Sequence, residues 1–236
     1  MTIHYHGTPI TPRAVLQTLT GKCFCVSHAA PQDIEWCHLN GQSVMLDNGA
    51  FSHWRTGKPK EDWTDYYEWC EQWLRYRTTW AVIPDVIDGT EEDNDKLLIE
   101  WPHVVDQASP VWHMHEGLAR LERLVKEWPT VCIGSSGDYE LKSAAWVHRM
   151  NGAWDLISRS KSNAVVHMLR GMQFVKREYQ WPFASVDSTD VARNHNRGSS
   201  ALEMCNRWDS MQCLPTWDGP LQGRLNMKQG AQTNDR

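Results

Sequence analysis

Short apolar segments recur along the chain, and most of them are followed by a stretch with the spacing of an amphipathic helix. These segments are rich in Val, Ile, Trp and Cys, and each ends in polar residues or glycine, which is typical of strands in a parallel sheet. Eight candidate strands result, over residues 3–6, 22–27, 43–47, 79–85, 110–115, 130–134, 164–169 and 182–187. The alternation favours an α/β fold with one closed parallel barrel, a (β/α)8 TIM-type barrel, although an open doubly wound sheet has the same periodicity.

Helices are expected between these strands, over residues 12–19, 60–77, 91–105, 117–128, 139–151 and 172–179. The fourth has an apolar stripe at helical spacing, formed by Leu118, Leu121, Leu124 and Val125. From about residue 198 the periodicity fades. We therefore expect a compact catalytic barrel over residues 1–197 without large added domains, and a C-terminal extension over 198–236 that is partly docked or disordered.

The amino-acid composition indicates a globular protein. With 41% hydrophobic and 22% charged residues the composition is globular, and no stretch reaches the ~20 apolar residues of a membrane span. The first residues lack the basic and apolar regions of a signal peptide, so we expect a cytoplasmic protein that does not enter a membrane. The seven cysteines are odd in number and scattered, which favours reduced thiols. Cys23 and Cys25 are expected to be core residues of a strand.

Charge is unevenly distributed along the chain. The formal net charge of −5 argues against a wholly basic nucleic-acid-binding protein. Residues 1–100 carry 15 Asp or Glu and 8 Lys or Arg, a net −7, whereas residues 142–207 carry 10 Lys or Arg and 5 acids, a net +5. The C-terminal part of the fold is therefore a candidate surface for a polyanion, and an ordinary solvated face is the alternative.

Aspartates end three of the predicted strands. Asp47 lies in LDNGAF, Asp85 in VIPDVIDG and Asp187 in FASVDSTDVARN. In a parallel barrel the functional groups come from the C-terminal ends of the strands, so these carboxylates are expected to converge at one mouth. Taken singly, the first two are also common turn residues, whereas Asp187 closes an apolar run. The turn at Gly134 and Ser135 is expected to offer backbone N–H groups to a carbonyl or an anion.

Two His-x-His pairs indicate a rival interpretation. They occur at His4/His6 and His113/His115, and such pairs at strand ends bind metal in hydrolase barrels. A metal-dependent hydrolase would use His4, His6, His113 and Asp187. Against this, the sixth predicted strand ends in Gly-Ser-Ser-Gly without a histidine, and no lysine ends the fourth. A barrel that binds nucleic acid without catalysis is a further alternative.

Four segments, taken in order, resemble the tRNA-guanine transglycosylase superfamily, whose members exchange guanine in a nucleic acid for a 7-deazaguanine base. LDNGAFS is similar to the family's first aspartate loop, IPDVIDG to its second, CIGSSG to its glycine-rich base-binding turn and VDSTDVARN to its nucleophile segment. In the last segment Asp187 and Arg193 keep the family's separation, and Asn194 also matches. The resemblance covers roughly residues 43–197 and implies a barrel enzyme that transfers a pentosyl group.

The resemblance also implies a role for each matched residue. Asp187 would be the nucleophile on the anomeric carbon of the sugar, and Asp47 would be the acid–base group that handles the proton of the base. Asp85 would accept hydrogen bonds from N1–H and the exocyclic amino group of guanine, and Phe51 would stack on the base. The other implied base contacts are backbone amides of Gly134 and Ser135, and His115, which stands where the family usually has glutamine.

Two departures from the family concern the substrate. Its tRNA-acting bacterial members carry a Cys-x-Cys-x-x-Cys and histidine zinc site near the C-terminus, and here only Cys205 and Cys213 lie in that region. The chain is also much shorter than those enzymes. Both features look like the compact phage-type branch, which places deazapurines in DNA. The resemblance thus implies DNA as the partner, with tRNA as the alternative. It also implies a 7-deazaguanine base such as preQ0 or a derivative, host cytoplasm as the location, and no cofactor or metal.

A base within a duplex has to be flipped out, or presented single-stranded, before its sugar can be attacked, at a cost of a few kcal/mol. Phosphate contacts that offset this cost are expected from the basic part of the chain. The candidates are Lys161, Arg170, Lys176, Arg177, Arg193 and Arg197.

Overall fold

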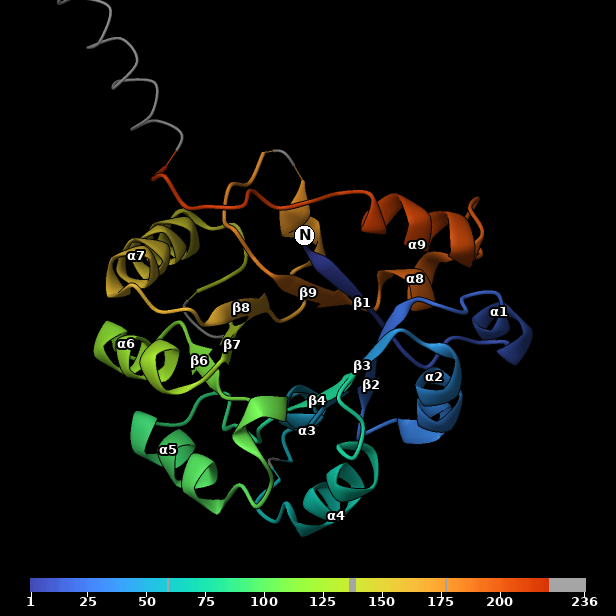
Figure 1. Cartoon of the computed structure of the whole chain (residues 1–236), viewed down its shortest axis with the longest axis horizontal. Helices are drawn as coiled ribbons and strands as arrows, with labels where there is room; N and C mark the ends of the chain where they lie inside the picture. The colour runs from blue at the N-terminus through green and yellow to red at the C-terminus, as the bar shows by residue number, and fades with distance from the viewer. Residues whose placement is uncertain (59, 136–138, 177, 221–236) are drawn as a thin grey trace, which may run out of the picture.

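Parallel strands form a ring at the centre of the molecule, and helices surround this ring (Figure 1). The computed structural model describes residues 1–58, 60–135, 139–176 and 178–220. The strands are β1 (Ile3–Gly7), β2 (Cys23–Ser27), β3 (Ser43–Asp47), β4 (Thr79–Val82), β5 (Ala108–Ser109), β6 (Val111–His113), β7 (Thr130–Gly134), β8 (Val165–Met168) and β9 (Ser185–Ser188). All pair in parallel, in the order β5-β4-β3-β2-β1-β9-β8-β7-β6. This is the α/β, barrel-like architecture that the alternation of strands and helices predicts.

The sheet is nearly closed because its two end strands are consecutive in the chain. β5 pairs with β4, β6 pairs with β7, and only Pro110 separates β5 from β6. Proline has no N–H to donate, but its carbonyl oxygen accepts a hydrogen bond from the backbone N of Cys132 at 2.9 Å. The predicted count of eight strands is therefore wrong. The described residues form nine, because the fifth predicted strand starts earlier than expected and is divided at Pro110.

Helices cover the outer face of the sheet, except α3, which follows β3 at the C-terminal end of the barrel. They are α1 (Arg13–Gln17), α2 (Ile34–Asn40), α3 (Ala50–Arg55), α4 (Thr64–Trp73), α5 (Glu91–Glu100), α6 (Leu118–Glu127), α7 (Ala144–Ser160), α8 (Asp190–Asn194) and α9 (Ala201–Asp209), with short 3-10 turns η1 (Pro31–Asp33), η2 (Val105–Gln107) and η3 (Met172–Val175). Five predicted helices are present with shifted ends. The sixth, over 172–179, is only the turn η3, and α2, α3, α8 and α9 lie outside the six predicted ranges. No helix among the described residues is long and apolar enough to cross a membrane.

Helix α9 lies where the sequence periodicity fades. It begins with a capping box, in which the Ser200 hydroxyl accepts from the backbone N of Glu203 at 3.2 Å and the Glu203 carboxylate accepts from the backbone N of Ser200 at 2.8 Å. The helix packs on α8 and β1. After it, the backbone N of Cys213 donates to the Thr2 hydroxyl at 3.0 Å. These contacts hold the segment against the barrel.

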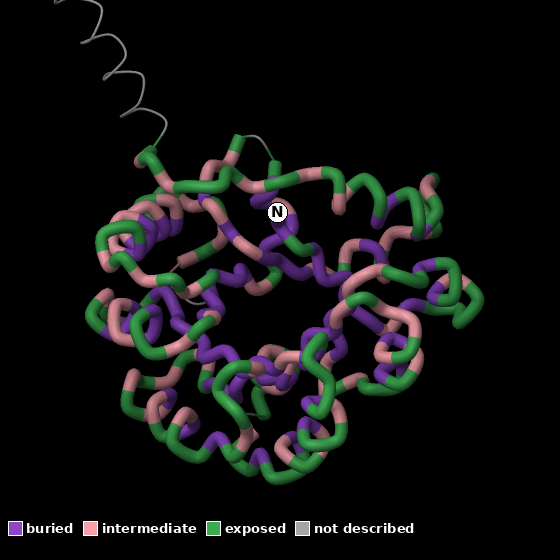
Figure 2. Tube along the Cα trace, in the orientation of Figure 1, coloured by how far each residue is buried: buried purple, intermediate pink, exposed green. Residues whose placement is uncertain are grey.

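The strands separate two layers of core, because alternate side chains point to opposite faces of a strand. Figure 2 shows that the trace is mostly buried along the central ring and exposed mainly on the surrounding helices and loops. The barrel interior is filled by a small cluster of Tyr5, Cys25, Met45, Val82, Val111 and Cys132. Two larger clusters lie between the strands and the helices, with fully buried Trp112 and Trp146 in one of them. All seven cysteines are free thiols, and Cys23 packs beside Cys25 in the interior cluster, which confirms the prediction of core strand residues.

Candidate active site at the mouth of the barrel

Three aspartates lie at the C-terminal ends of the strands. Asp47 ends β3, Asp187 lies near the end of β9, and Asp85 follows the end of β4 by three residues. Asp187 pairs with Tyr5, whose ring fills the interior, so its carboxylate also points inward. Asp47 lies two residues after Met45, another interior residue, and has the same orientation. Both other aspartates lie near enough to Asp47 to raise its pKa. The structure thus brings the three carboxylates to one mouth.

The pKa of the Asp47 carboxyl group is raised well above its ordinary value. Burial raises the pKa of Asp47 from its ordinary value of 3.8 to about 6, and the charges of Asp187 and Asp85 act in the same direction. A carboxyl group with a pKa in this range is able both to give and to accept a proton near neutral pH. Its environment therefore suits an acid–base role.

Asn48 and Gly49 connect the Asp47 loop to the Asp85 loop. The side-chain N–H groups of Asn48 donate to the carbonyl oxygen of Ile83 at 2.9 Å and to Oδ1 of Asp85 at 2.8 Å. Gly49 has a φ of +81°, in the left-handed region that glycine adopts without strain, and helix α3 starts directly after it. The Asn-Gly pair of the sequence therefore ties together two of the three carboxylate loops.

Asp85 is 7% exposed and is held by a second donor. Its Oδ2 accepts from Nε2 of His113 at 2.9 Å. The His113 ring packs so closely on Gly134 that a Cβ there would lie 2.8 Å from Nδ1. The backbone N of His113 donates to Glu116 at 2.8 Å, and Arg120 donates to the same buried carboxylate at 2.7 Å. These contacts fix the plane of the Asp85 carboxylate.

Asp187 is 8% exposed, and its hydrogen bonds are concentrated on one oxygen. Oδ1 accepts from the backbone N of Arg170 at 2.6 Å and lies 3.2 Å from Nε2 of His167. Among the described residues no hydrogen-bond donor contacts Oδ2. Within the part of the chain that the structure describes, the two donors to this inward-facing carboxylate therefore share one oxygen.

Arg170 lies in this mouth and not on an outer surface. Its guanidinium carbon is 3.8 Å from the centroid of the Phe51 ring, and Nη2 donates to the carbonyl oxygen of Ser135 at 2.7 Å. Burial lowers the pKa of Arg170, while the carboxylates of Asp187, Asp47 and Asp85 oppose that shift. The ring predicted to stack on a base is therefore covered by a cation, and Arg170 is placed as a counter-ion to the carboxylates.

Two further residues predicted to contact the base, His115 and Ser135, lie at different distances from the centre of the mouth. His115 is exposed, its Nε2 donates to the carbonyl oxygen of Gly89 at 2.9 Å, and its ring stacks on His113 with 5.6 Å between centroids. Ser135 is 5% exposed, and its hydroxyl donates to the carbonyl oxygen of Tyr139 at 2.8 Å. The structure thus places Ser135 beside Arg170 at the mouth, whereas His115 lies at its edge.

The cations predicted to contact phosphate do not form one group. Lys161 follows α7 and lines a hollow with Ala164, at the N-terminal end of β8, so it lies at the end of the barrel opposite the aspartates. Arg193 and Arg197 are exposed on the segment that leaves the C-terminal end of β9, on the mouth side. Lys176 is exposed after η3. Arg177 lies outside the described residues.

The histidines of the metal interpretation are not brought together. His4 and His6 point to the outer face of β1, away from Tyr5, and Nε2 of His6 donates to Asp209 at 3.0 Å. His113 contacts Asp85 instead. Within residues 1–58, 60–135, 139–176 and 178–220, no group of three His, Cys, Asp or Glu side chains is arranged to hold a metal ion.

Sequence reasoning missed His167. It lies on β8 in the motif VVHM, is fully buried, and contacts Asp187. The available signal was its position: a histidine within an apolar strand, one residue before the strand end that faces the mouth.

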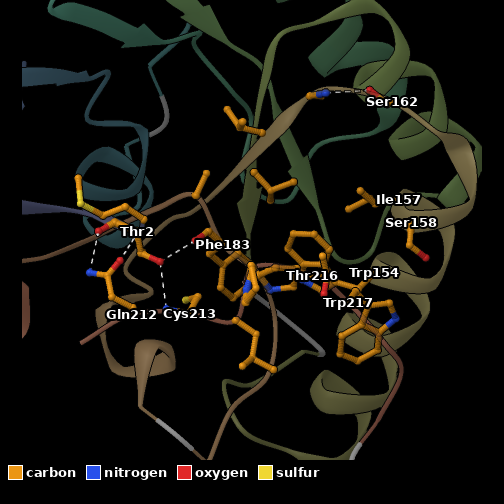
Figure 3. Close-up of a pocket in the computed structure, with 18 residues that line it drawn as sticks. Thr2, Trp154, Ile157, Ser158, Ser162, Phe183, Gln212, Cys213, Thr216 and Trp217 are labelled. Atoms are coloured by element: carbon orange, nitrogen blue, oxygen red, sulfur yellow. Dashed lines mark hydrogen bonds between the residues drawn. The ribbon is translucent and has the colours of Figure 1, made fainter. Parts of the chain in front are cut away.

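A cleft of about 730 Å³ lies at the other end of the barrel (Figure 3). It is bounded by the N-terminal ends of β8 and β9, by α7 and by the segment 212–217, with Trp154, Phe183 and Trp217 among its walls. Active sites of parallel barrels lie at the C-terminal strand ends, and none of the three aspartates lines this cleft. The mouth is therefore the candidate active site.

Comparison with known proteins finds no match to any family model, to any curated protein or to any solved structure.

Proposed function

We propose that this protein is a base-exchange transglycosylase, which replaces guanine in DNA with a 7-deazaguanine derivative. The observation that carries the proposal is the convergence of Asp47, Asp85 and Asp187 at one mouth, each in a different environment. One carboxyl has a pKa of about 6, one is held rigidly by two donors, and one has an oxygen to which no described residue donates. These environments match an acid–base group, a recognition group and a nucleophile, as the resemblance to the transglycosylase superfamily implies.

In the first step Oδ2 of Asp187 would attack the anomeric carbon of the target nucleotide. A bond forms between this oxygen and C1′, the C1′–N9 bond breaks, and its electron pair leaves with guanine. Asp47, in its protonated form, gives a proton to the departing base. Asp187 also stabilises the oxocarbenium-like transition state, as the nucleophile of a retaining glycosidase does.

In the second step the incoming deazaguanine would reverse these events. Its N9 attacks C1′, the ester bond to Asp187 breaks, and the electron pair returns to the carboxylate. The N9 proton passes to Asp47, which is then ready for another cycle. One base leaves and one enters, so the exchange balances without an energy-supplying cofactor.

Asp85 would select guanine-like bases. Guanine and 7-deazaguanine present two adjacent donors, N1–H and the exocyclic amino group, and both oxygens of one carboxylate accept them together. Adenine presents an acceptor beside a donor and is rejected. Because Asn48 and His113 fix the Asp85 carboxylate, its orientation is set before the base arrives.

DNA is the proposed partner, on the resemblance to the phage-type branch of the superfamily. Exposed Arg193 and Arg197 lie on the mouth side and are suited to contact the phosphates of a flipped-out or single-stranded nucleotide. Transfer RNA is the alternative substrate.

The decisive experiment measures incorporation of labelled guanine into DNA and tRNA in parallel, with a denaturing gel to trap a covalent adduct. We expect exchange and an adduct with DNA for the wild type, and neither for Asp187→Ala. Exchange only into tRNA would establish the alternative. Absence of exchange and adduct with both nucleic acids would reject the proposal.

A further inference from the structure

A histidine that the exchange steps do not use lies directly beside the nucleophile. His167 is fully buried, and its Nε2 lies 3.2 Å from Oδ1 of Asp187. On the other side of the ring, Nδ1 lies 2.8 Å from the hydroxyl oxygen of Ser185. Tyr5 and Trp80 contact the ring edge to face, with centroids at 6.0 and 5.3 Å. Both ring nitrogens therefore have partners, and aromatic neighbours hold the ring in place.

These two hydrogen bonds define which nitrogen carries the proton. An ionised carboxylate has no proton to donate, so Nε2 of His167 is the donor to Asp187. In the neutral ring Nδ1 is then an acceptor, and the Ser185 hydroxyl donates to it. The direction of donation runs from Ser185 through His167 to Asp187.

We propose that His167 is a positioning residue that orients Asp187 for attack, an inference that rests on the transglycosylase function. Two donors, Nε2 of His167 and the backbone N of Arg170, converge on Oδ1. The second oxygen is thereby presented to the sugar. Without His167, the Arg170 amide is the one donor that remains among the described residues, and the carboxylate gains freedom to rotate about its Cβ–Cγ bond. A misplaced reacting atom lowers the rate by about 100-fold.

Substitutions at His167 test this role through a split between kcat and KM. We expect His167→Leu to lower kcat for base exchange by about 100-fold and to leave KM for the free base unchanged, because Asp85 still binds the base. His167→Gln keeps an N–H group able to reach Asp187 and should recover about tenfold of that loss. An unchanged kcat in His167→Leu, or a loss confined to KM, would overturn the proposal.

The matched control is His4→Leu, which removes another buried histidine from a nearby strand, on the face of β1 away from the mouth. Its kcat should equal that of the wild type. Thermal unfolding of each variant establishes that it is folded. If His167→Leu does not fold, His167→Gln and Ser185→Ala still test the role, since both should lower kcat at constant KM.

A spectroscopic measurement tests the geometry without turnover. Long-range ¹⁵N–¹H NMR correlations of the His167 ring should identify the Nε2-protonated form in the wild type and a changed pattern in Ser185→Ala. A ring protonated only at Nδ1 would overturn the assignment. If the wild type exchanges no base on any nucleic acid, the transglycosylase function fails, whereas an exchanging wild type with an unaffected His167→Leu variant refutes only the positioning role.

Discussion

Replacing Asp47 by asparagine should stabilise the protein at neutral pH. The pKa of this carboxyl group is 3.8 when unperturbed and about 6 in the folded protein, mainly because of burial. Between these values the folded state binds more protons than the unfolded state, so stability falls as pH rises from about 4 to about 6. Asparagine has similar size and carries no charge at any pH, so the variant avoids this loss.

The size of the effect follows from the shift. A difference of about 2 pKa units corresponds to about 3 kcal/mol at pH 7, falling to about 1.5 kcal/mol at pH 5 and about 0.5 kcal/mol at pH 4. These are upper values, because solvent reaches part of the Asp47 side chain. For a chain of this length, 3 kcal/mol corresponds to a rise in Tm of roughly 6–12 °C.

Urea unfolding of both proteins at pH 4, 5 and 7 measures this difference. Asp106→Asn, on an exposed turn, is the matched control and should unfold like the wild type at each pH. An Asp47→Asn variant that is no more stable than the wild type at pH 7, or whose advantage does not shrink toward pH 4, would refute the reasoning. Such a result would mean that the mouth does not disfavour the ionised Asp47.

Two further substitutions probe the supports of Asp85. Gly134→Ala places a methyl group 2.8 Å from Nδ1 of His113 and should destabilise the protein by about 1–3 kcal/mol, measured by urea unfolding; an unchanged midpoint would show that the ring has room to move. Glu116→Ala leaves Arg120 buried without this partner and should cost about 3–5 kcal/mol. A loss below 1 kcal/mol, in the range of an exposed ion pair, would contradict the buried character of the Glu116–Arg120 pair.

The convergence of the three aspartates could be predicted from the sequence, because strand ends in a parallel barrel meet at one edge whatever the details of packing. The alternation of side chains along a strand also predicts where the histidines of β1 point. Tyr5 is the large apolar residue between His4 and His6, so an inward Tyr5 places both histidines on the outer face of β1. Period-two alternation alone therefore weakens the metal interpretation.

Other features depend on contacts between distant segments. The break at Pro110 arises because one extended stretch pairs with β4 on one side and β7 on the other, which local sequence does not encode. The rule that functional residues stand at the last position of a strand does not identify His167, because this residue lies inside β8. Charge alone predicts phosphate contacts for both Lys161 and Arg170. In the fold, Lys161 lies at the end of the barrel opposite the aspartates, and Arg170 lies in the mouth.

Arg170 combines two functions that are separable in the structure. Its backbone N–H holds Oδ1 of Asp187, whereas its side chain covers Phe51 and compensates the carboxylates. In the proposed reaction, a base that stacks on Phe51 would have to displace the guanidinium, but the backbone amide would not have to move with the side chain. The proposed nucleophile Asp187 would therefore stay oriented while the guanidinium leaves the proposed base site. Displacement of the cation would also leave the carboxylates less compensated, which would favour the protonated form of Asp47 at the step of the proposed reaction in which the departing base takes up a proton.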